Sequence, residues 1–312
     1  MAGKRKPLYY FWTPNYWYIW LCLGLLRLSC LLPYHVQLRI FKAAGRLLHR
    51  FDTRRRETAR RNIGICLPDL SADERDALTL AHYEALGASM MELGLARWAS
   101  DEKIAALSRI EGAENLTTAL NQGEHVILLT GHFTALELSG RVMQPICPRI
   151  DAVFQLHPHE FLTEILRTNR ERVAEQTIES SDVRRMVRSL KSGAALWFAP
   201  DQSVRSKQSV LTTFFDEPAL NNTAATKLAK LSKAIAIPWF LCRCPDGGYV
   251  MTILPRLKNF PSDDPIKDSK QFTAVLEDAI RRCPEQYLWT YRKFKGRPEP
   301  LPDVYANLDE SK

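Results

Sequence analysis

Short apolar runs alternate with longer stretches of helical hydrophobic period through most of the chain, and this alternation constrains the fold strongly. The runs predict strands at 125–130, 150–155, 194–199, 235–241 and 249–254. The intervening stretches predict helices at 134–143, 159–173, 181–191, 221–233 and 268–282. Parallel strands need a crossover between them, and a helix usually supplies it. We therefore expect an α/β domain with a central, mostly parallel sheet flanked by helices.

The composition fits an ordered protein with an anionic partner. The 312 residues are 46% apolar and 25% charged, which excludes a disordered chain. The formal net charge of +8 favours membrane phospholipid, nucleic acid, or an acidic substrate or carrier as a partner. The seven cysteines are odd in number and mostly lie in apolar surroundings, so we expect reduced core residues. The sequence contains no zinc-ligand spacing, P-loop or dinucleotide fingerprint.

An apolar segment at 15–34 is long enough to cross a bilayer, and its aromatic residues gather at one end. Arg27 interrupts the segment, and an arginine in mid-membrane is costly. The segment predicts either a single-pass anchor or a helix lying in the membrane plane. We therefore assign residues 1–34 to an N-terminal membrane-anchoring helix.

The next segment, 35–51, predicts a basic amphipathic helix. On a helical wheel its basic face and its apolar face are opposite; the basic face holds Arg39, Lys42, Arg46 and Arg50, and the apolar face Val36, Ile40, Ala44, Leu47, Leu48 and Phe51. Such a helix suits an anionic membrane surface, although one packed on the core with a solvated basic face has the same pattern. Residues 39–61 carry nine Lys and Arg against two acids, which predicts that the domain at 35–300 faces the cytosol. We expect a loosely ordered tail at 301–312.

The motif with most chemical content is Leu-Thr-Gly-His-Phe-Thr-Ala-Leu-Glu-Leu at 129–138, directly after a predicted strand. His132 and Glu137 are five positions apart, so on one continuous helix their side chains would diverge by about 140°. They can meet only if His132 precedes the helix and Glu137 lies in its first turn. Thr134 as N-cap with Glu137 at N3 would form a capping box in that arrangement. A histidine base with an orienting carboxylate is the pair that acyl transfer to a hydroxyl needs, although packing and capping alone also explain the pattern.

Together these features resemble the late acyltransferases of lipid A biosynthesis, of lauroyl/myristoyl type, within the lysophospholipid acyltransferase superfamily. The resemblance extends over nearly the whole chain. It rests on the N-terminal anchor and on motifs in a fixed order: TARRNIGICLPDLSADER at 58–75, the His132/Glu137 motif, WFAPDQ at 197–202, Asn-Thr-Ala-Ala-Thr at 222–226 and YLWTYRKFKGRPE at 287–299.

The resemblance implies an O-acyltransferase that moves an acyl chain from acyl carrier protein to a hydroxyl of a Kdo-bearing lipid A precursor, without a metal or bound cofactor. The site would lie at the cytosolic face of the Gram-negative inner membrane. The partners implied are the acidic carrier protein, an anionic glycolipid and the membrane. Basic clusters at 54–61, 205–207 and 292–297 are candidates for binding them.

Residue roles follow from the same resemblance. His132 would take the proton of the acceptor hydroxyl, and Glu137 would orient and stabilise the imidazole. Arg170 matches an arginine on a helix of the family, where it would stabilise an oxyanion or bind a phosphate. Asp201, Gln202 and Arg205 follow a predicted strand, where open α/β sheets bind ligands, and would position the acceptor or support the base.

Two segments depart from the family pattern. Residues 155–160 are Gln-Leu-His-Pro-His-Glu, and Ser203-Val204-Arg205 follows the Pro-Asp-Gln motif. Both would face the site, and His157 and His159 are candidates to assist it. The departures keep open a related membrane acyltransferase with another glycolipid or a lysophospholipid as acceptor. A non-catalytic protein that binds anionic lipid is a further alternative, and a nucleic-acid-binding protein would rest on charge alone.

Overall fold

The computed structural model describes residues 6–203 and 209–309. A seven-stranded sheet has the order β1-β9-β8-β2-β5-β3-β4 and is parallel except between β8 and β9. Its strands are β1 (Ser108–Glu111), β2 (Val126–Leu129), β3 (Ile150–Phe154), β4 (Thr177–Glu179), β5 (Ala195–Phe198), β8 (Ile235–Arg243) and β9 (Tyr249–Ile253). The expected α/β class and all five predicted strands are confirmed, each to within two residues. The short edge strands β1 and β4 were not predicted.

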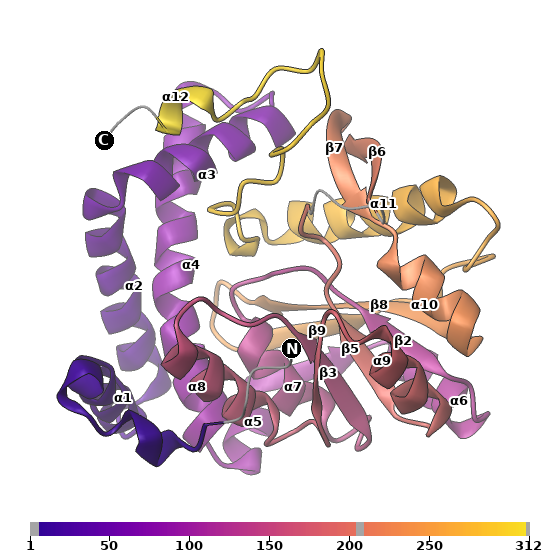
Figure 1. Ribbon diagram of the computed structural model, residues 1–312. Helices are drawn as coiled ribbons and strands as arrows, with labels where there is room; N and C mark the ends of the chain where they lie inside the picture. Colours follow the sequence, from indigo (N-terminus) through magenta and orange to yellow (C-terminus); the bar gives the residue numbers. More distant parts are fainter. Residues whose placement is uncertain (1–5, 204–208, 310–312) are drawn as a thin grey trace.

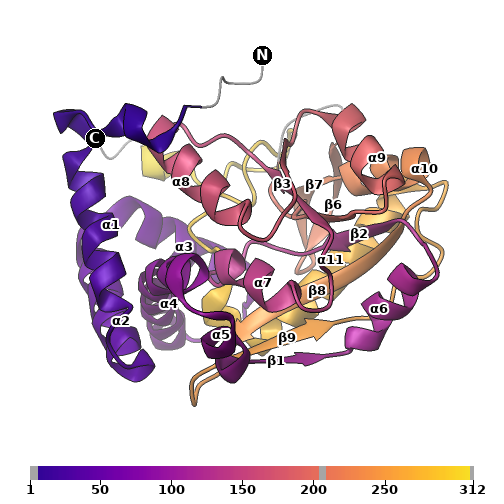
Figure 2. The same cartoon turned by 90° about the horizontal axis from the view of Figure 1, so that it is seen from below.

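Helices cover both faces of this sheet, as Figures 1 and 2 show. One face is covered by α4 (Ala72–Trp98), α5 (Asp101–Leu107), α6 (Ala113–Asn121) and α7 (Leu136–Met143). The other face is covered by α3 (Thr53–Cys66), α9 (Val183–Lys191), α10 (Ala224–Ser232) and α11 (Pro265–Arg282). The helices predicted from hydrophobic period are confirmed to within three residues at each end.

Strand β2 explains why the sheet is covered on both sides. Val126 and Leu128 belong to the core beneath α4–α7, whereas Ile127 and Leu129 belong to the core beneath α9–α11. Successive side chains of a strand point to opposite faces, so a wholly apolar strand must be buried twice. This places β2 at the centre of the molecule, and the segment that follows it begins at the carboxyl edge of the sheet.

A hairpin of β6 (Ser209–Phe214) and β7 (Glu217–Asn222) packs against α11. Phe215 and Asp216 form its two-residue turn, both with positive φ. This turn lacks the Asn-Gly or Gly signal that normally marks such hairpins, which is why the sequence did not reveal it. Part of the segment expected to be a loose tail packs on the domain, because Tyr305 is buried and donates a hydrogen bond to the Asn62 Oδ1 atom of α3 at 2.5 Å.

At the other end of the molecule, α1 (Trp17–Ser29) and α2 (Tyr34–Phe51) lie outside α4, as both views show. Within the 15–34 segment, α1 is only 13 residues long and ends at Ser29, and Pro33 is the N-cap of the next helix. Within residues 6–203 and 209–309, no helix combines the length and apolar character that crossing a bilayer requires. The expectation of a single-pass anchor is not supported.

Helix α2 crosses α4 at very close range. A Cβ atom at Gly45 would collide with the carbonyl group of Tyr83, and one at Gly87 would collide with that of Phe41. The glycine side of α2 thus faces α4, and the apolar face predicted from its helical wheel is left in contact with solvent: Ile40, Leu47, Leu48 and Phe51 are all exposed. On α4, the Ser71–Glu74 capping box is present. The expectation that all cysteines are reduced is wrong, because a disulfide joins Cys242 of β8 to Cys283 after α11.

Candidate active site

The segment 130–135 leads from the carboxyl end of β2 into α7 and carries His132. Its backbone is held on two sides, because the Thr130 N–H donates to the carbonyl of Phe198 at 3.0 Å and the Leu288 N–H donates to the carbonyl of His132 at 2.9 Å. Gly131 permits this path, since a Cβ there would press on Leu276. The imidazole is thereby fixed at the carboxyl edge of the sheet, where open α/β folds bind their ligands.

The partner of the imidazole is Asp201, which follows β5. The Nδ1 atom of His132 lies 2.5 Å from the Asp201 Oδ1 atom, and the His132 backbone N–H donates to Oδ2 at 2.9 Å. The carboxylate is almost fully buried, at 1% exposed, while the imidazole side chain is 29% exposed. An ionised carboxylate only accepts hydrogen bonds, so Nδ1 donates to it, and in the neutral imidazole the lone pair is then on Nε2.

Two further side chains surround Asp201. The hydroxyl of Tyr287 donates to its Oδ2 atom at 3.2 Å, and the ammonium group of Lys293 donates to its backbone carbonyl at 2.8 Å. Burial raises the pKa of the Asp201 carboxyl, but the interactions with His132 and the charge of Lys293 outweigh burial, and the pKa lies below its ordinary value. Asp201 is therefore an ionised carboxylate at neutral pH.

Glu137 has a different partner from the one expected. Its carboxylate accepts a hydrogen bond from the Arg170 Nη2 atom at 2.6 Å, with longer bonds from Nε. Arg170 closes α8 (Glu160–Arg170), also donates to the carbonyl of Val153, and lies over the ring of Trp197. In the described part of the chain, the Nδ1 contact expected of Glu137 is made by Asp201. The Glu137–Arg170 pair links the first turn of α7 to α8.

The expected capping box on α7 is also absent from the described helix. Ala135 occupies the N-cap, with no side-chain hydrogen bond, and the Thr134 N–H donates instead to the carbonyl of Gln286 at 2.8 Å. The Thr134 hydroxyl faces Arg243, whose guanidinium forms a buried ion pair with Glu92 of α4. The entry to α7 is thus held by tertiary contacts rather than by a local cap.

The other predicted residues have separate outcomes. Gln202 follows Asp201 and is partly buried, and Arg205 lies outside the described residues. His159 contacts Tyr18 of α1 at 3.3 Å rather than the base. Lys293, which the sequence placed in a basic surface cluster, is buried beneath Asp201.

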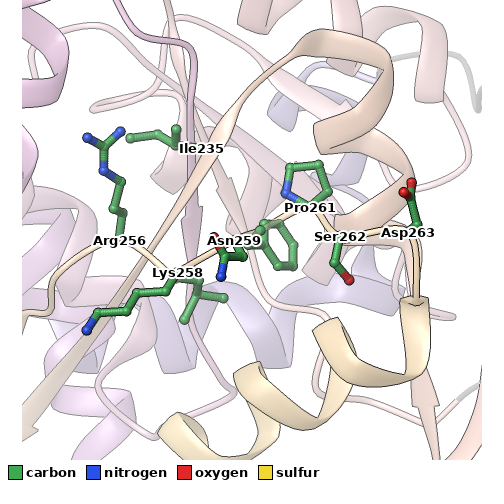
Figure 3. A pocket seen from close by; sticks show the side chains of 9 residues that line it. Ile235, Arg256, Lys258, Asn259, Pro261, Ser262 and Asp263 are labelled. Atoms are coloured by element: carbon green, nitrogen blue, oxygen red, sulfur yellow. The ribbon is translucent and has the colours of Figure 1, made fainter.

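A cavity of about 760 Å³ lies away from these residues, beside the segment between β9 and α11. Figure 3 shows Ile235, Arg256 and Lys258 among the side chains that line it. Ile235 begins β8 and pairs with Val126, the first residue of β2, so the cavity is at the amino edge of the parallel strands. His132 is at the opposite edge, and we therefore exclude this cavity from the candidate active site.

The arrangement can perform general base chemistry. A half-open imidazole with its Nδ1 proton held by a buried carboxylate can remove a proton from a hydroxyl placed at Nε2. The carboxylate then stabilises the imidazolium that forms. The same proton can return to a leaving group, so the pair suits transfer of an acyl group between two acceptors.

Comparisons with known proteins identify the family to which the chain belongs. Residues 6–296 match the family model described as bacterial lipid A biosynthesis acyltransferase. The chain is 33% identical over 294 residues to the lipid A biosynthesis lauroyltransferase of Escherichia coli K12, with 94% of this chain and 96% of the relative covered. It is 34% identical to the palmitoleoyltransferase of the same organism, with 95% and 96% covered, and 29% identical to a lipid A biosynthesis acyltransferase of Haemophilus influenzae, with 98% and 100% covered. The chain therefore belongs to the bacterial lipid A biosynthesis acyltransferase family.

Proposed function

We propose that this protein transfers a fatty acyl chain from an acyl carrier protein thioester to a hydroxyl of a Kdo-bearing lipid A precursor. The observation that carries the proposal is the His132–Asp201 pair, with its 2.5 Å hydrogen bond and its exposed imidazole edge. Membership of the acyltransferase family supports the reaction class and the lipid A acceptor. The carrier-protein thioester as donor and the Kdo sugars on the acceptor go beyond what family membership supports and are part of our proposal.

In the proposed mechanism, the Nε2 atom of His132 removes the proton of the acceptor hydroxyl as its oxygen attacks the thioester carbonyl. Asp201 stabilises the imidazolium and keeps Nε2 aimed at the reacting oxygen. Collapse of the tetrahedral oxyanion expels the carrier thiolate, which takes the proton back from Nε2 as the ester forms. In this proposal Asp201 takes the role that was predicted for Glu137: it orients the His132 base and does not bind the acceptor.

Glu137 and Arg170 take a supporting part in this proposal. Their ion pair is about one-sixth exposed on each side and fixes the start of α7 beside the base. The predicted contact of Arg170 with an oxyanion or a phosphate stays a prediction. Because Glu137 already pairs with the Arg170 guanidinium, Arg170 would stabilise such an anionic group less strongly than an unpaired arginine.

Membrane attachment is part of the proposal and is supported by apolar side chains on two helices. On α1 these side chains are Trp17, Tyr18, Leu21, Leu25 and Leu28, and on α2 they are Ile40, Leu47, Leu48 and Phe51. Exposed apolar surface on this scale favours contact with lipid over water. Arg39 and Arg50 flank the α2 face and suit anionic headgroups. We infer a helix pair lying in the plane of the cytosolic leaflet of the Gram-negative inner membrane.

The test is an acyl-transfer assay with membranes that contain the protein, a Kdo-bearing tetra-acylated lipid A precursor and a panel of acyl carrier protein thioesters. His132→Ala should abolish transfer. His125→Ala is the matched control, because His125 precedes the opposite end of the same strand and should leave transfer intact. No transfer with any donor would overturn the lipid A acceptor, and activity on another glycolipid or a lysophospholipid would establish the alternative.

A further inference from the structure

Lys293 is a buried cation that the mechanism above does not use. Lys293 is only 3% exposed. Its ammonium group donates to two neutral oxygens, the carbonyl of Asp201 and the Oδ1 atom of Asn221, both at 2.8 Å. The Nζ atom also lies 4.8 Å from the ring centroid of Phe214. Burying a charged lysine costs free energy that hydrogen bonds to neutral oxygens offset only in part, so a buried ammonium group points to a specific role.

The surroundings of Lys293 fasten three distant segments together. The Ser203 hydroxyl donates to the carbonyls of Lys293 at 2.6 Å and of Leu220 at 2.7 Å, and the Tyr291 hydroxyl donates to the carbonyl of Ser203 at 2.6 Å. The loop that carries Asp201 is therefore held by β7 on one side and by the C-terminal segment on the other. A displacement of this loop would move the carboxylate away from His132.

The other titratable groups around Lys293 lie on several elements. Cys66 faces it from α3 and Glu277 from α11, while Tyr287 and Tyr291 lie beside Asp201. Burial raises the pKa of the Cys66 thiol and of both tyrosine hydroxyls, so these groups are neutral at pH 7. Glu277 accepts the backbone N–H of Phe215 and pairs with Arg281. Among the described residues, Lys293 is thus the buried cation whose charge acts on the Asp201 carboxylate.

We propose that Lys293 is a positioning residue for the base, which holds the Asp201 loop against His132 and places a fixed positive charge behind the carboxylate. This inference rests on the proposed function. The charge helps to keep Asp201 ionised, so that the carboxylate can accept the hydrogen bond of the His132 imidazole. Burial lowers the pKa of Lys293 itself to about 8, and it therefore remains mostly protonated at pH 7.

The test measures His132 directly in the full-length, substrate-free protein by an NMR titration of histidine ring signals, with His132→Ala to identify the signal. Lys293→Met should raise the His132 pKa by about one unit, because a nearby cation no longer opposes the imidazolium. Lys293→Gln, which keeps a donor but removes the charge, should give the same shift and guards against a folding failure of the first variant. Arg297→Met is the matched control, since its buried guanidinium is in the same segment but is neutralised by Glu217.

In the transfer assay, Lys293→Met should lower kcat about tenfold and leave KM for both substrates unchanged, with the acid limb of the pH profile moved upward. A His132 pKa within about 0.2 units of the wild-type value in both Lys293 variants would overturn the proposal. An equal shift in Arg297→Met would do the same. If wild type showed no transfer at all, the proposed function would fail, whereas the NMR titration would still decide the role of Lys293.

Discussion

Replacing Asp201 with asparagine tests the assignment of the base partner most sharply. The carboxylate accepts three hydrogen bonds: from His132 Nδ1 at 2.5 Å, from the His132 backbone N–H at 2.9 Å and from the Tyr287 hydroxyl at 3.2 Å. An asparagine amide presents one acceptor and one donor in place of two acceptors. In one orientation the NH₂ group takes the place of Oδ2 and faces two donors, the His132 backbone N–H and the Tyr287 hydroxyl. In the other orientation it takes the place of Oδ1 and donates to Nδ1, which forces the imidazole proton onto Nε2. In the second orientation His132 cannot accept a proton.

The magnitude follows from these contacts. Losing one charge-assisted hydrogen bond to the imidazole costs about 1.5–3 kcal/mol, or roughly 10- to 150-fold in rate. If the wrong tautomer prevails, the loss approaches about 10⁴-fold, the size seen for the equivalent change in serine protease triads. We therefore expect kcat to fall about 10²- to 10⁴-fold, with KM nearly unchanged because Asp201 is shielded from substrate.

The comparison is with Glu137→Gln in the same transfer assay. This change weakens the ion pair with Arg170 but leaves the Nδ1 contact of His132 intact, so kcat should fall only about tenfold. Circular dichroism and thermal unfolding would check that both variants are folded. An Asp201→Asn enzyme that kept a third or more of its activity, or a Glu137→Gln enzyme that lost more than Asp201→Asn, would refute the assignment.

Three further predictions concern stability, geometry and the membrane. The pKa of Lys293 lies at about 8 rather than 10.5, so between these pH values this group binds fewer protons in the native state than in the unfolded state and by itself makes stability rise with pH. Buried thiol and tyrosine groups with raised pKa values act in the opposite direction, so the test compares two proteins: from pH 8 to about 10, urea unfolding should show wild type gaining stability relative to Lys293→Met, by at most about 3 kcal/mol. Arg170→Lys removes a bridging guanidinium and should lower kcat about tenfold in the transfer assay, a loss that unchanged kinetics would contradict. Leu25→Asp and Leu47→Asp should each weaken sedimentation with anionic vesicles by roughly tenfold or more, since burying a leucine contributes about 2 kcal/mol, whereas Leu211→Asp on β6 should not.

The sheet could be predicted because its signal is local. Each central strand is a run of apolar residues buried on both faces, and the runs are separated by helical periods, so the pattern is written in adjacent residues. The hairpin β6–β7 carries no such signal, because its turn places Phe215 and Asp216 at positive φ without glycine or asparagine. The edge strand β4 is only three residues long, which is too short for any period to appear.

The membrane segment illustrates a different limit. The helical wheel of α2 identified its basic and apolar faces correctly, but it could not indicate which side packs on the protein. The structure uses a third side, which contains Gly45, to approach α4. Only the close contact with Gly87 reveals this choice, and it leaves the apolar face exposed. An amphipathic pattern therefore predicts a buried face only when the neighbouring helix is known.

Local reasoning predicted Glu137 as the base partner and left Asp201 to position the acceptor or support the base, because the sequence does not show which carboxylate reaches the imidazole. Glu137 is five residues from His132 and was the natural candidate, yet the chain between them turns at Ala135 before α7 begins, and the carboxylate reaches Arg170. Asp201 is 69 residues away and becomes adjacent only because β2 and β5 are neighbours in the sheet. Two parallel neighbours end at the same edge, so a polar residue after each is brought together by the sheet order. The sequence motif after β5 identified Asp201 as a candidate, and the strand order explains why it lies beside His132.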